Sequence, residues 1–230
     1  MHFVARKCVV LLADFCVVYF TIYKNGILLF GGSNIQQSKE YIDEVLSHFD
    51  KGDMLLLQNE VNLLDYIIDS AYERGLQIAF NPSPFDNNVM LCDLSQIAYL
   101  FLNEIEGEQI TGTNNPDKII QSLLKMFPKS KIILTLGKKG VIYCDENEIC
   151  KQDIFPLSVV DTTAAGDTFT GYFLSSIILQ KTIEEVLQIA SMASSITVSR
   201  MGASASIPQM KEVIDALEIA FSMNLNSISL

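Results

Sequence analysis

The sequence predicts an α/β fold in which a mostly parallel β-sheet carries helices on both faces. Short apolar runs alternate with segments of helical periodicity, no linker or repeat divides the chain, and 49% of the 230 residues are hydrophobic. Buried parallel strands are typically short continuous apolar runs, and the helices between them cover the sheet. We therefore expect a single domain over residues 1–230, with ligands bound at the carboxyl ends of the strands.

The first predicted element is a β-hairpin. Residues 17–23 and 27–30 are apolar and rich in β-forming residues, and Asn25-Gly26 between them is typical of a two-residue turn. Residues 8–20 form an apolar run that is shorter than a bilayer span of about 20 residues, and no small-residue cleavage site follows it. We assign residues 1–15 to no element.

Strands and helices alternate after the hairpin. Gly75 ends one predicted helix, Pro116 lies in the first turn of another, and Thr182-Ile-Glu-Glu185 is a capping box for a third. The polar stretch 145–147 separates two strands and predicts an antiparallel pair. The predicted strands are 54–58, 77–80, 97–102, 131–136, 141–144 and 149–155, and the predicted helices are 62–74, 116–127, 166–179, 183–198 and about 208–223.

The net charge and the cysteine content limit which partners and which cellular location we expect. There are 16 Lys and Arg against 27 Asp and Glu, a net charge of −11, which disfavours nucleic acid and anionic membrane as partners. A nucleotide remains compatible, because it needs only one local positive pocket. The five cysteines are an odd number without a C-x-x-C pair, so we expect free thiols and a cytoplasmic location.

One segment combines the features that phosphoryl transfer needs. In Val159-Val-Asp-Thr-Thr-Ala-Ala-Gly-Asp-Thr-Phe169, a β-like run passes through a turn of small residues into a helix. A helix start with uncovered backbone N–H groups favours an anion such as phosphate. Asp167, in the first helical turn, is placed to accept a proton from a hydroxyl nucleophile. Taken alone, the pattern leaves open that Asp161 or Asp167 only caps the helix.

This segment resembles the C-terminal signature of the ribokinase (PfkB) family of carbohydrate kinases, and is most similar to the ribokinases within it. Further motifs occur in the family's order and approximate spacing, and the resemblance extends roughly from residue 27 to the C-terminus. The resemblance implies a ribokinase-like three-layer sandwich, in which the hairpin at residues 17–30 corresponds either to a remnant of the family's β-lid or to late N-terminal strands. The supporting motifs are Asn81-Pro-Ser-Pro84, Asn103-Glu-Ile-Glu106, Thr135-Leu-Gly-Lys-Lys-Gly140 and Arg200-Met-Gly-Ala-Ser-Ala-Ser206.

The resemblance implies roles for individual residues. Asp167 would be the catalytic base and a contact to both substrates, and Ala164, Ala165 and Gly166 would form the anion hole, with Gly166 also touching the nucleotide. Glu60 would bind the sugar, although the residues alone are equally compatible with a surface Glu at a helix start. The expected cofactors are ATP, Mg²⁺ and an activating K⁺.

The remaining implied roles concern the nucleotide and the cations. Glu106 would act indirectly on magnesium, and its alternative is a solvated Glu at a helix start. For Gly137 to Gly140, the alternative is a plain turn. The implied nucleotide contacts are Asn103, Thr135, Gly137 and Gly140, and the implied monovalent-cation residues are Asp161, Thr163, Thr197, Arg200, Gly202 and Ser206.

The N-terminal block of the family has no counterpart in this sequence. In the family it supplies an early Asp, a Gly-Gly motif and most of the lid, so we expect an N-terminally truncated chain with little ribose phosphorylation of its own. The predicted activity is phosphorylation of ribose or a related pentose by ATP. The alternatives are a catalytically impaired nucleotide-binding remnant and a nucleoside or vitamin kinase. The expected partners are small molecules, with a homodimer through the lid as a further expectation.

Overall fold

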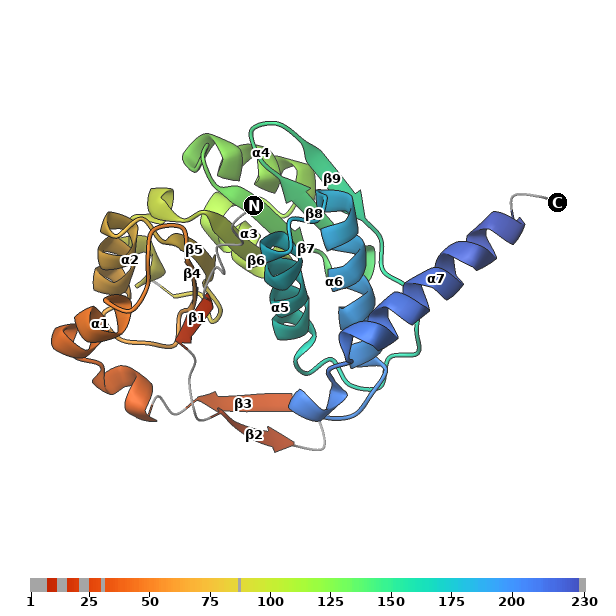
Figure 1. The fold of residues 1–230 in the computed structure, drawn as a ribbon, viewed down its shortest axis with the longest axis horizontal. Coiled ribbons are helices and arrows are strands. Elements are labelled where there is room, and N and C mark those ends of the chain that lie inside the picture. Colours follow the sequence, from red (N-terminus) through yellow and green to blue (C-terminus); the bar gives the residue numbers. More distant parts are fainter. Residues whose placement is uncertain (1–7, 12–15, 21–24, 30–31, 87, 228–230) are drawn as a thin grey trace. The chain divides into compact units, whose positions relative to one another are not determined.

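The computed structural model describes the chain except residues 1–7, 12–15, 21–24, 30–31, 87 and 228–230 (Figure 1). It divides into two compact units. The first comprises residues 1–134 and 144–147, and the second comprises residues 135–143 and 148–230. Within the described ranges, no helix is long and apolar enough to cross a membrane.

The first unit is an α/β layer built on parallel strands. Its strands follow the order β1-β4-β5-β6-β7, and β1, β4, β5 and β6 pair in parallel. This parallel arrangement confirms the predicted fold class. The strands are β1 Cys8–Leu11, β4 Met54–Gln58, β5 Gln77–Asn81, β6 Tyr99–Asn103 and β7 Lys131–Thr135, whose last residue begins the second unit.

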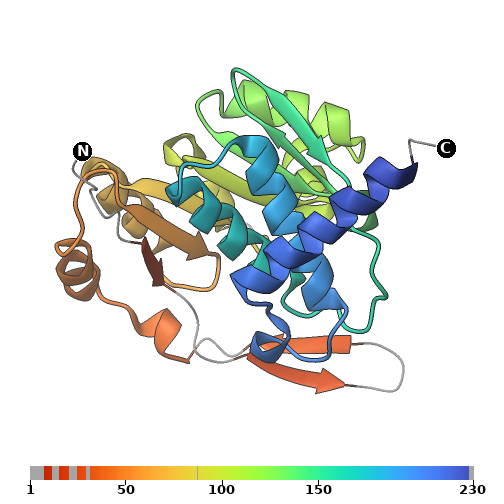
Figure 2. The same cartoon turned by 45° about the vertical axis from the view of Figure 1, so that its right-hand side comes forward.

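The helices of this unit pack on the sheet and on one another. Helices α1 and α2 lie side by side in Figures 1 and 2, and α2 also packs on β5. Because β4 to β6 are buried in this layer, their side chains form continuous apolar runs, with Leu55, Ile78 and Leu100 fully buried. The helices are α1 Lys39–Leu46, α2 Leu64–Glu73, α3 Glu104–Thr111 and α4 Pro116–Met126, with 3₁₀ turns η1 Gly32–Gln36, η2 Val89–Leu91 and η3 Leu94–Gln96.

The N-terminal hairpin exists, but its turn is not where the sequence predicts it. Strand β2, Cys16–Phe20, pairs antiparallel with β3, Asn25–Leu29, as a separate two-stranded sheet. Asn25 pairs with Phe20, and Gly26 pairs with Tyr19. The turn prediction at Asn25-Gly26 is therefore wrong, because both residues belong to β3 and the connection falls at residues 21–24, outside the described residues.

The second unit contains the segment predicted to carry the chemistry. Helix α6 packs between α5 and α7, and a cluster with Met192, Ile196, Val213 and Leu217 forms the core between α6 and α7 (Figure 2). Strands β8 and β9 are neighbours joined by four residues, a connection that only an antiparallel pair allows. The elements are η4 Gly137–Lys139, β8 Val141–Cys144, β9 Ile149–Gln152, α5 Ala165–Ile178, α6 Ile183–Val198, η5 Ser204–Ser206 and α7 Met210–Ser227.

Candidate active site

The turn before α5 is organised by the carboxylate of Asp161. One oxygen, Oδ1, accepts hydrogen bonds from the Thr163 backbone N–H at 2.9 Å and from its hydroxyl at 2.7 Å. The other oxygen accepts the backbone N–H of Gly202 at 3.1 Å. The hydrogen bonds from Thr163, followed by that from Gly202, hold the pKa of Asp161 below its ordinary value. Asp161 thus ties the loop after α6 to the turn before α5.

Helix α5 begins without a side-chain cap. Its N-cap residue is Ala164, whose φ of 61° lies in the left-handed region that non-glycine residues rarely adopt. Asp167 is exposed in the first turn, so neither Asp161 nor Asp167 is the N-cap residue. A Cβ added at Gly166 would meet no atom within 4 Å. The helix therefore begins without a side-chain hydrogen bond at its positive dipole end, and the side-chain position of Gly166 in its first turn faces open space.

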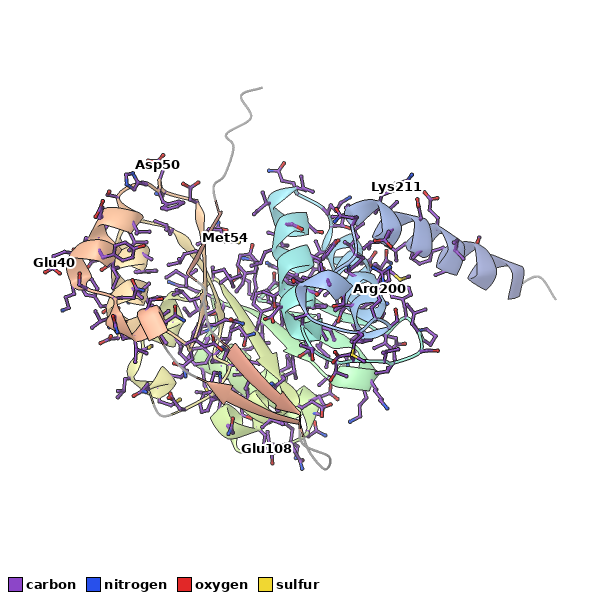
Figure 3. The ribbon with its side chains drawn as sticks, turned by 90° about the horizontal axis from the view of Figure 1, so that it is seen from below. Glu40, Asp50, Met54, Glu108, Arg200 and Lys211 are labelled. Carbon is purple, nitrogen blue, oxygen red and sulfur yellow. The ribbon has the colours of Figure 1, made fainter. Side chains whose placement is uncertain are left out.

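The loop between α6 and α7 supplies further predicted cation residues. The Arg200 guanidinium pairs with Glu212 at 2.7 Å, and the second Glu212 oxygen accepts the Gln209 N–H at 2.9 Å. Figure 3 shows Arg200 near the start of α7, where Lys211 also lies. The Arg200 side chain thus fastens the loop to α7. Buried Ser206 donates its hydroxyl to the carbonyl of Ala203 within the loop at 2.6 Å.

Thr197 lies inside α6 rather than on this loop. It is fully buried, and its hydroxyl donates to the hydroxyl of Thr168 on α5 at 3.2 Å. Its backbone carbonyl accepts the N–H of Arg200 at 3.1 Å. Among the six predicted cation residues, hydrogen bonds therefore join Asp161 to Thr163 and Gly202, and Thr197 to Arg200.

The predicted nucleotide loop is a tight turn between β7 and β8. Thr135 ends β7, and the Leu136 N–H donates to the Gly140 carbonyl at 2.8 Å. Gly140 has a φ of +84°, and a Cβ there would lie 2.0 Å from the backbone oxygen of Gln152. Only glycine fits that approach. Gly137 is also left-handed, with a φ of +53°, but a Cβ there would meet nothing within 4 Å.

The other predicted site residues belong to the first unit and follow the ends of neighbouring strands. Glu60 follows β4, and Asn103 ends β6, with β5 between the two strands. Asn103 caps α3 by accepting the N–H groups of Ile105 and Glu106, and the Glu106 carboxylate accepts the Asn103 N–H at 2.9 Å. The N-x-x-E motif is thus a complete capping box.

Glu106 is buried, so the alternative interpretation of it as a solvated Glu at a helix start is wrong. It is 4% exposed, and burial raises the pKa of its carboxyl against the opposing hydrogen bonds from Asn103 and Ser83. The partnership with Ser83 joins the Asn81-Pro-Ser-Pro84 motif to the N-x-x-E motif. Within the described part of the chain, no group of three or more His, Cys, Asp or Glu side chains could hold a metal ion alone.

Sequence reasoning missed four contacts that shape these loops. Asn59 donates to the carbonyl of Pro84 and to the Asp86 carboxylate, Ser83 bonds to Glu106, and Glu212 anchors Arg200. Each contact joins residues more than ten positions apart, so no local sequence pattern predicts it. For the contacts in the first unit, the sequence gives only an indirect indication, because loops that follow adjacent parallel strands lie at one edge of a sheet.

Comparison with protein families identifies the class to which this fold and these motifs belong. The family model described as pfkB family carbohydrate kinase matches residues 15–210. The chain belongs to this family. The ribokinase of Haemophilus influenzae is 31% identical over 207 residues, and the match covers 86% of this chain and 66% of that protein. The chain therefore spans just under two thirds of that relative's length.

Solved structures give the same relationship. A ribokinase from Thermotoga maritima matches with a TM-score of 0.72 and 32% identity, over 84% of this chain and 65% of that one. The ribokinase of Arabidopsis thaliana, solved in complex with ribose and ATP, matches with a TM-score of 0.71 and 28% identity over the same shares. The fold is therefore ribokinase-like.

Proposed function

We propose that this chain carries machinery that transfers a phosphoryl group from ATP to a sugar hydroxyl, with ribose or a related pentose as acceptor. The observation that carries the proposal is the start of α5. An exposed carboxylate, Asp167, lies in the first turn of a helix whose N-cap has no side-chain hydrogen bond and whose Gly166 borders open space. A carboxylate base beside an anion site is the combination that hydroxyl phosphorylation requires.

In the proposed reaction, Asp167 takes the proton of the attacking sugar hydroxyl. The backbone N–H groups of Ala164, Ala165 and Gly166 stabilise the charge that develops on the transferred phosphoryl group. The helix dipole adds about half a positive charge at this end. The left-handed Ala164 supports this role, because such strain tends to persist where function needs a particular backbone geometry.

The nucleotide and its metal ion are assigned to two further motifs. Thr135, Gly137 and Gly140 would contact ATP, and the glycines allow the backbone to come close to it. Asn103 and Glu106 would organise Mg²⁺ and phosphate. Mg²⁺ usually keeps several waters and binds one or two carboxylates plus substrate phosphates, so a single buried carboxylate beside a helix start suits it. The ion would neutralise charge on the phosphates.

We further propose that a monovalent cation, K⁺, activates the enzyme from the loops that Asp161 joins. Carbonyl oxygens suit K⁺ because they replace its hydration shell. Asp161 would set the positions of the two loops, Thr163 and Gly202 would lie beside the ion, and Thr197, Arg200 and Ser206 would complete the surroundings through backbone or hydroxyl oxygens. The hydrogen bonds of Asp161 to both loops support this arrangement.

Glu60 is the proposed sugar contact, because a carboxylate can accept hydrogen bonds from several hydroxyls. Its place after β4, next to the loop that follows β5, agrees with ligand binding at the carboxyl ends of parallel strands. The ribose bound to the Arabidopsis relative supports a pentose acceptor.

The test is ATP-dependent phosphorylation of a panel of pentoses, hexoses, nucleosides and vitamin alcohols, run with Mg²⁺ and K⁺ alongside direct measurement of nucleotide binding. Transfer to ribose or another pentose is the expected result, at a low rate for ribose, because the family's N-terminal sugar-binding block has no counterpart in this sequence. Transfer only to nucleosides or vitamin alcohols would replace the proposed acceptor. ATP binding without transfer to any acceptor would indicate a nucleotide-binding protein instead. We retain this alternative because the match covers only 66% of the Haemophilus relative.

A further inference from the structure

The loop that follows β5, residues 81–86, is fastened to the end of β4 by one side chain. The amide nitrogen of Asn59 donates to the carbonyl of Pro84 at 2.6 Å and to the carboxylate of Asp86 at 3.1 Å. An Asn amide has two N–H donors, so these two bonds use its full donor capacity. Asn59 directly precedes Glu60, the proposed sugar contact.

Asp86 is also fixed from the far side of the loop. The same oxygen that Asn59 contacts accepts the Asn88 backbone N–H at 2.9 Å, and the other oxygen accepts the Asn88 side-chain amide at 3.1 Å. The carboxylate is therefore held in one orientation, and Asn59 meets an ordered partner rather than a freely rotating one.

The same loop is joined to the end of β6. The Ser83 N–H donates to the Asn81 side chain at 3.1 Å, which shapes the turn, and the Ser83 side chain hydrogen-bonds the buried carboxylate of Glu106. Since β4, β5 and β6 are adjacent parallel strands, the loop connects the ends of all three. It lies between the proposed sugar contact after β4 and the proposed magnesium and phosphate residues after β6.

We infer that Asn59 is a positioning residue for the acceptor sugar: its side-chain amide locks the loop of residues 81–86 against the end of β4 and so fixes the backbone that carries Glu60. This inference rests on the proposed function, because it takes Glu60 as the sugar contact. Asn59 touches no reacting atom. It acts by limiting the positions that Glu60 and the loop can adopt before sugar binds, which reduces the ordering that binding requires.

The variants are chosen to separate positioning from loss of stability. Asn59→Ala removes both hydrogen bonds, and we expect the Kd or KM of the acceptor to rise about 3- to 10-fold, the effect of one or two ordinary hydrogen bonds. The nucleotide Kd and kcat should change less than about 2-fold, because a contact made equally in ground and transition states affects KM alone. Asn115→Ala is the matched control, since Asn115 caps α4 through the Lys118 N–H.

A charge swap tests the pairing itself. Asn59→Asp replaces the donor amide with a carboxylate facing that of Asp86, so its acceptor Kd should exceed that of Asn59→Ala. Adding Asp86→Asn to Asn59→Asp restores a donor and an acceptor in reversed roles and should recover part of the loss. A double variant no better than Asn59→Asp would contradict the pairing as the source of the effect.

Hydrogen exchange provides a readout that does not depend on catalysis. In the full chain carrying Asn59→Ala, the backbone amides of Ser83 and Asn88 should exchange faster than in the wild type, because the loop that contains Ser83 and the Asp86 carboxylate that accepts the Asn88 N–H both lose the support of Asn59. The exchange rates of the backbone amides in α6 should not change. Unchanged exchange at Ser83 and Asn88 would overturn the inference whatever the chain phosphorylates.

The two proposals fail in different ways. If the wild type binds no sugar in the panel, the proposed function is overturned and the positioning role falls with it. If the wild type binds a pentose and Asn59→Ala binds it equally well, the positioning role alone is overturned. An equal weakening in Asn59→Ala and Asn115→Ala would likewise reject positioning in favour of a general loss of stability.

Discussion

At the scale of single residues, three carboxylates lie in three different environments. The carboxylate of Asp161 accepts three hydrogen bonds, which stabilise its charged form. Glu106 is buried, and its charged form is disfavoured. Asp167 is exposed at a helix start. Similar side chains therefore suit different tasks, because hydrogen bonding and burial act on the charged form in opposite directions.

Asp167→Asn tests the base assignment. We expect kcat to fall by about 10²-fold or more, because the amide cannot accept the hydroxyl proton. The free energy of unfolding should stay nearly constant, since Asp167 is exposed and is not the N-cap of α5. Steady-state kinetics and urea unfolding measure both quantities, and Asp215→Asn on the exposed side of α7 is the control. A kcat equal to that of the wild type would remove Asp167 from the mechanism.

Glu106→Gln tests the buried carboxyl through the pH dependence of stability. Its pKa in the folded state is raised above the ordinary value near 4.5, so the folded state holds this proton more tightly than the unfolded state. The Glu106 contribution to stability therefore falls as pH rises from about the ordinary pKa through the raised one. The glutamine variant should lack this contribution. Urea unfolding of both proteins from pH 4 to pH 8 should show the wild type losing stability relative to Glu106→Gln, and parallel pH profiles would contradict the prediction.

At the scale of elements, the site depends on how loops are held by strands and helices. The carboxylate of Asp161 bridges to Gly202, 41 residues away, and Arg200 pairs with Glu212 at the start of α7. The loop after α6 is thus fixed on both sides.

Elements with strong local signals could be predicted from the sequence. Strand β4 and helix α6 have the predicted bounds, and Thr182 and Glu185 form the predicted capping box. Helix α1 was missed, because it buries only Ile42 and Leu46.

Asp161→Ala should reduce activation by potassium. Without the carboxylate, Gly202 and Thr163 lose their shared acceptor, and the two loops no longer hold a fixed spacing. We expect the wild type to be faster in KCl than in tetramethylammonium chloride, and the variant to lose most of that difference. Initial rates at matched ionic strength measure it. A wild type with equal rates in the two salts would contradict the proposed cation site.

Gly140→Ala should destabilise the protein far more than Gly137→Ala. Both glycines have positive φ, which costs a non-glycine residue about 1–2 kcal/mol. Only at Gly140 does the new Cβ also meet the backbone, 2.0 Å from the Gln152 oxygen. The backbone must shift there, so we expect about 2–5 kcal/mol of destabilisation. Thermal and urea unfolding of the two variants measure the difference, and similar losses would show that the Gln152 backbone moves freely.

At the scale of the whole molecule, the acidic composition and the candidate nucleotide residues lead to one prediction. MgATP should raise the melting temperature progressively, since a ligand that binds only the folded state stabilises it by about 2.7 kcal/mol at a hundredfold excess over Kd. Duplex DNA at equal phosphate concentration should not, because the chain has a net charge of −11. Scanning fluorimetry measures the melting temperature with each ligand. A rise in melting temperature with DNA and none with MgATP would contradict the prediction that nucleic acid is not a partner.

The sequence by itself determined the α/β class, most elements after residue 50, the family and the order of its motifs. These follow from local periodicity, capping residues and contiguous signatures. The cytoplasmic location, the single domain, the homodimer and the site roles stay predictions. Only the tertiary structure decided that Glu106 is buried, that Ala164 is left-handed, that Asp161 holds Gly202 and that Asn59 holds the loop after β5. The physical reason is that burial and long-range hydrogen bonds depend on partners distant in sequence, which no local pattern specifies.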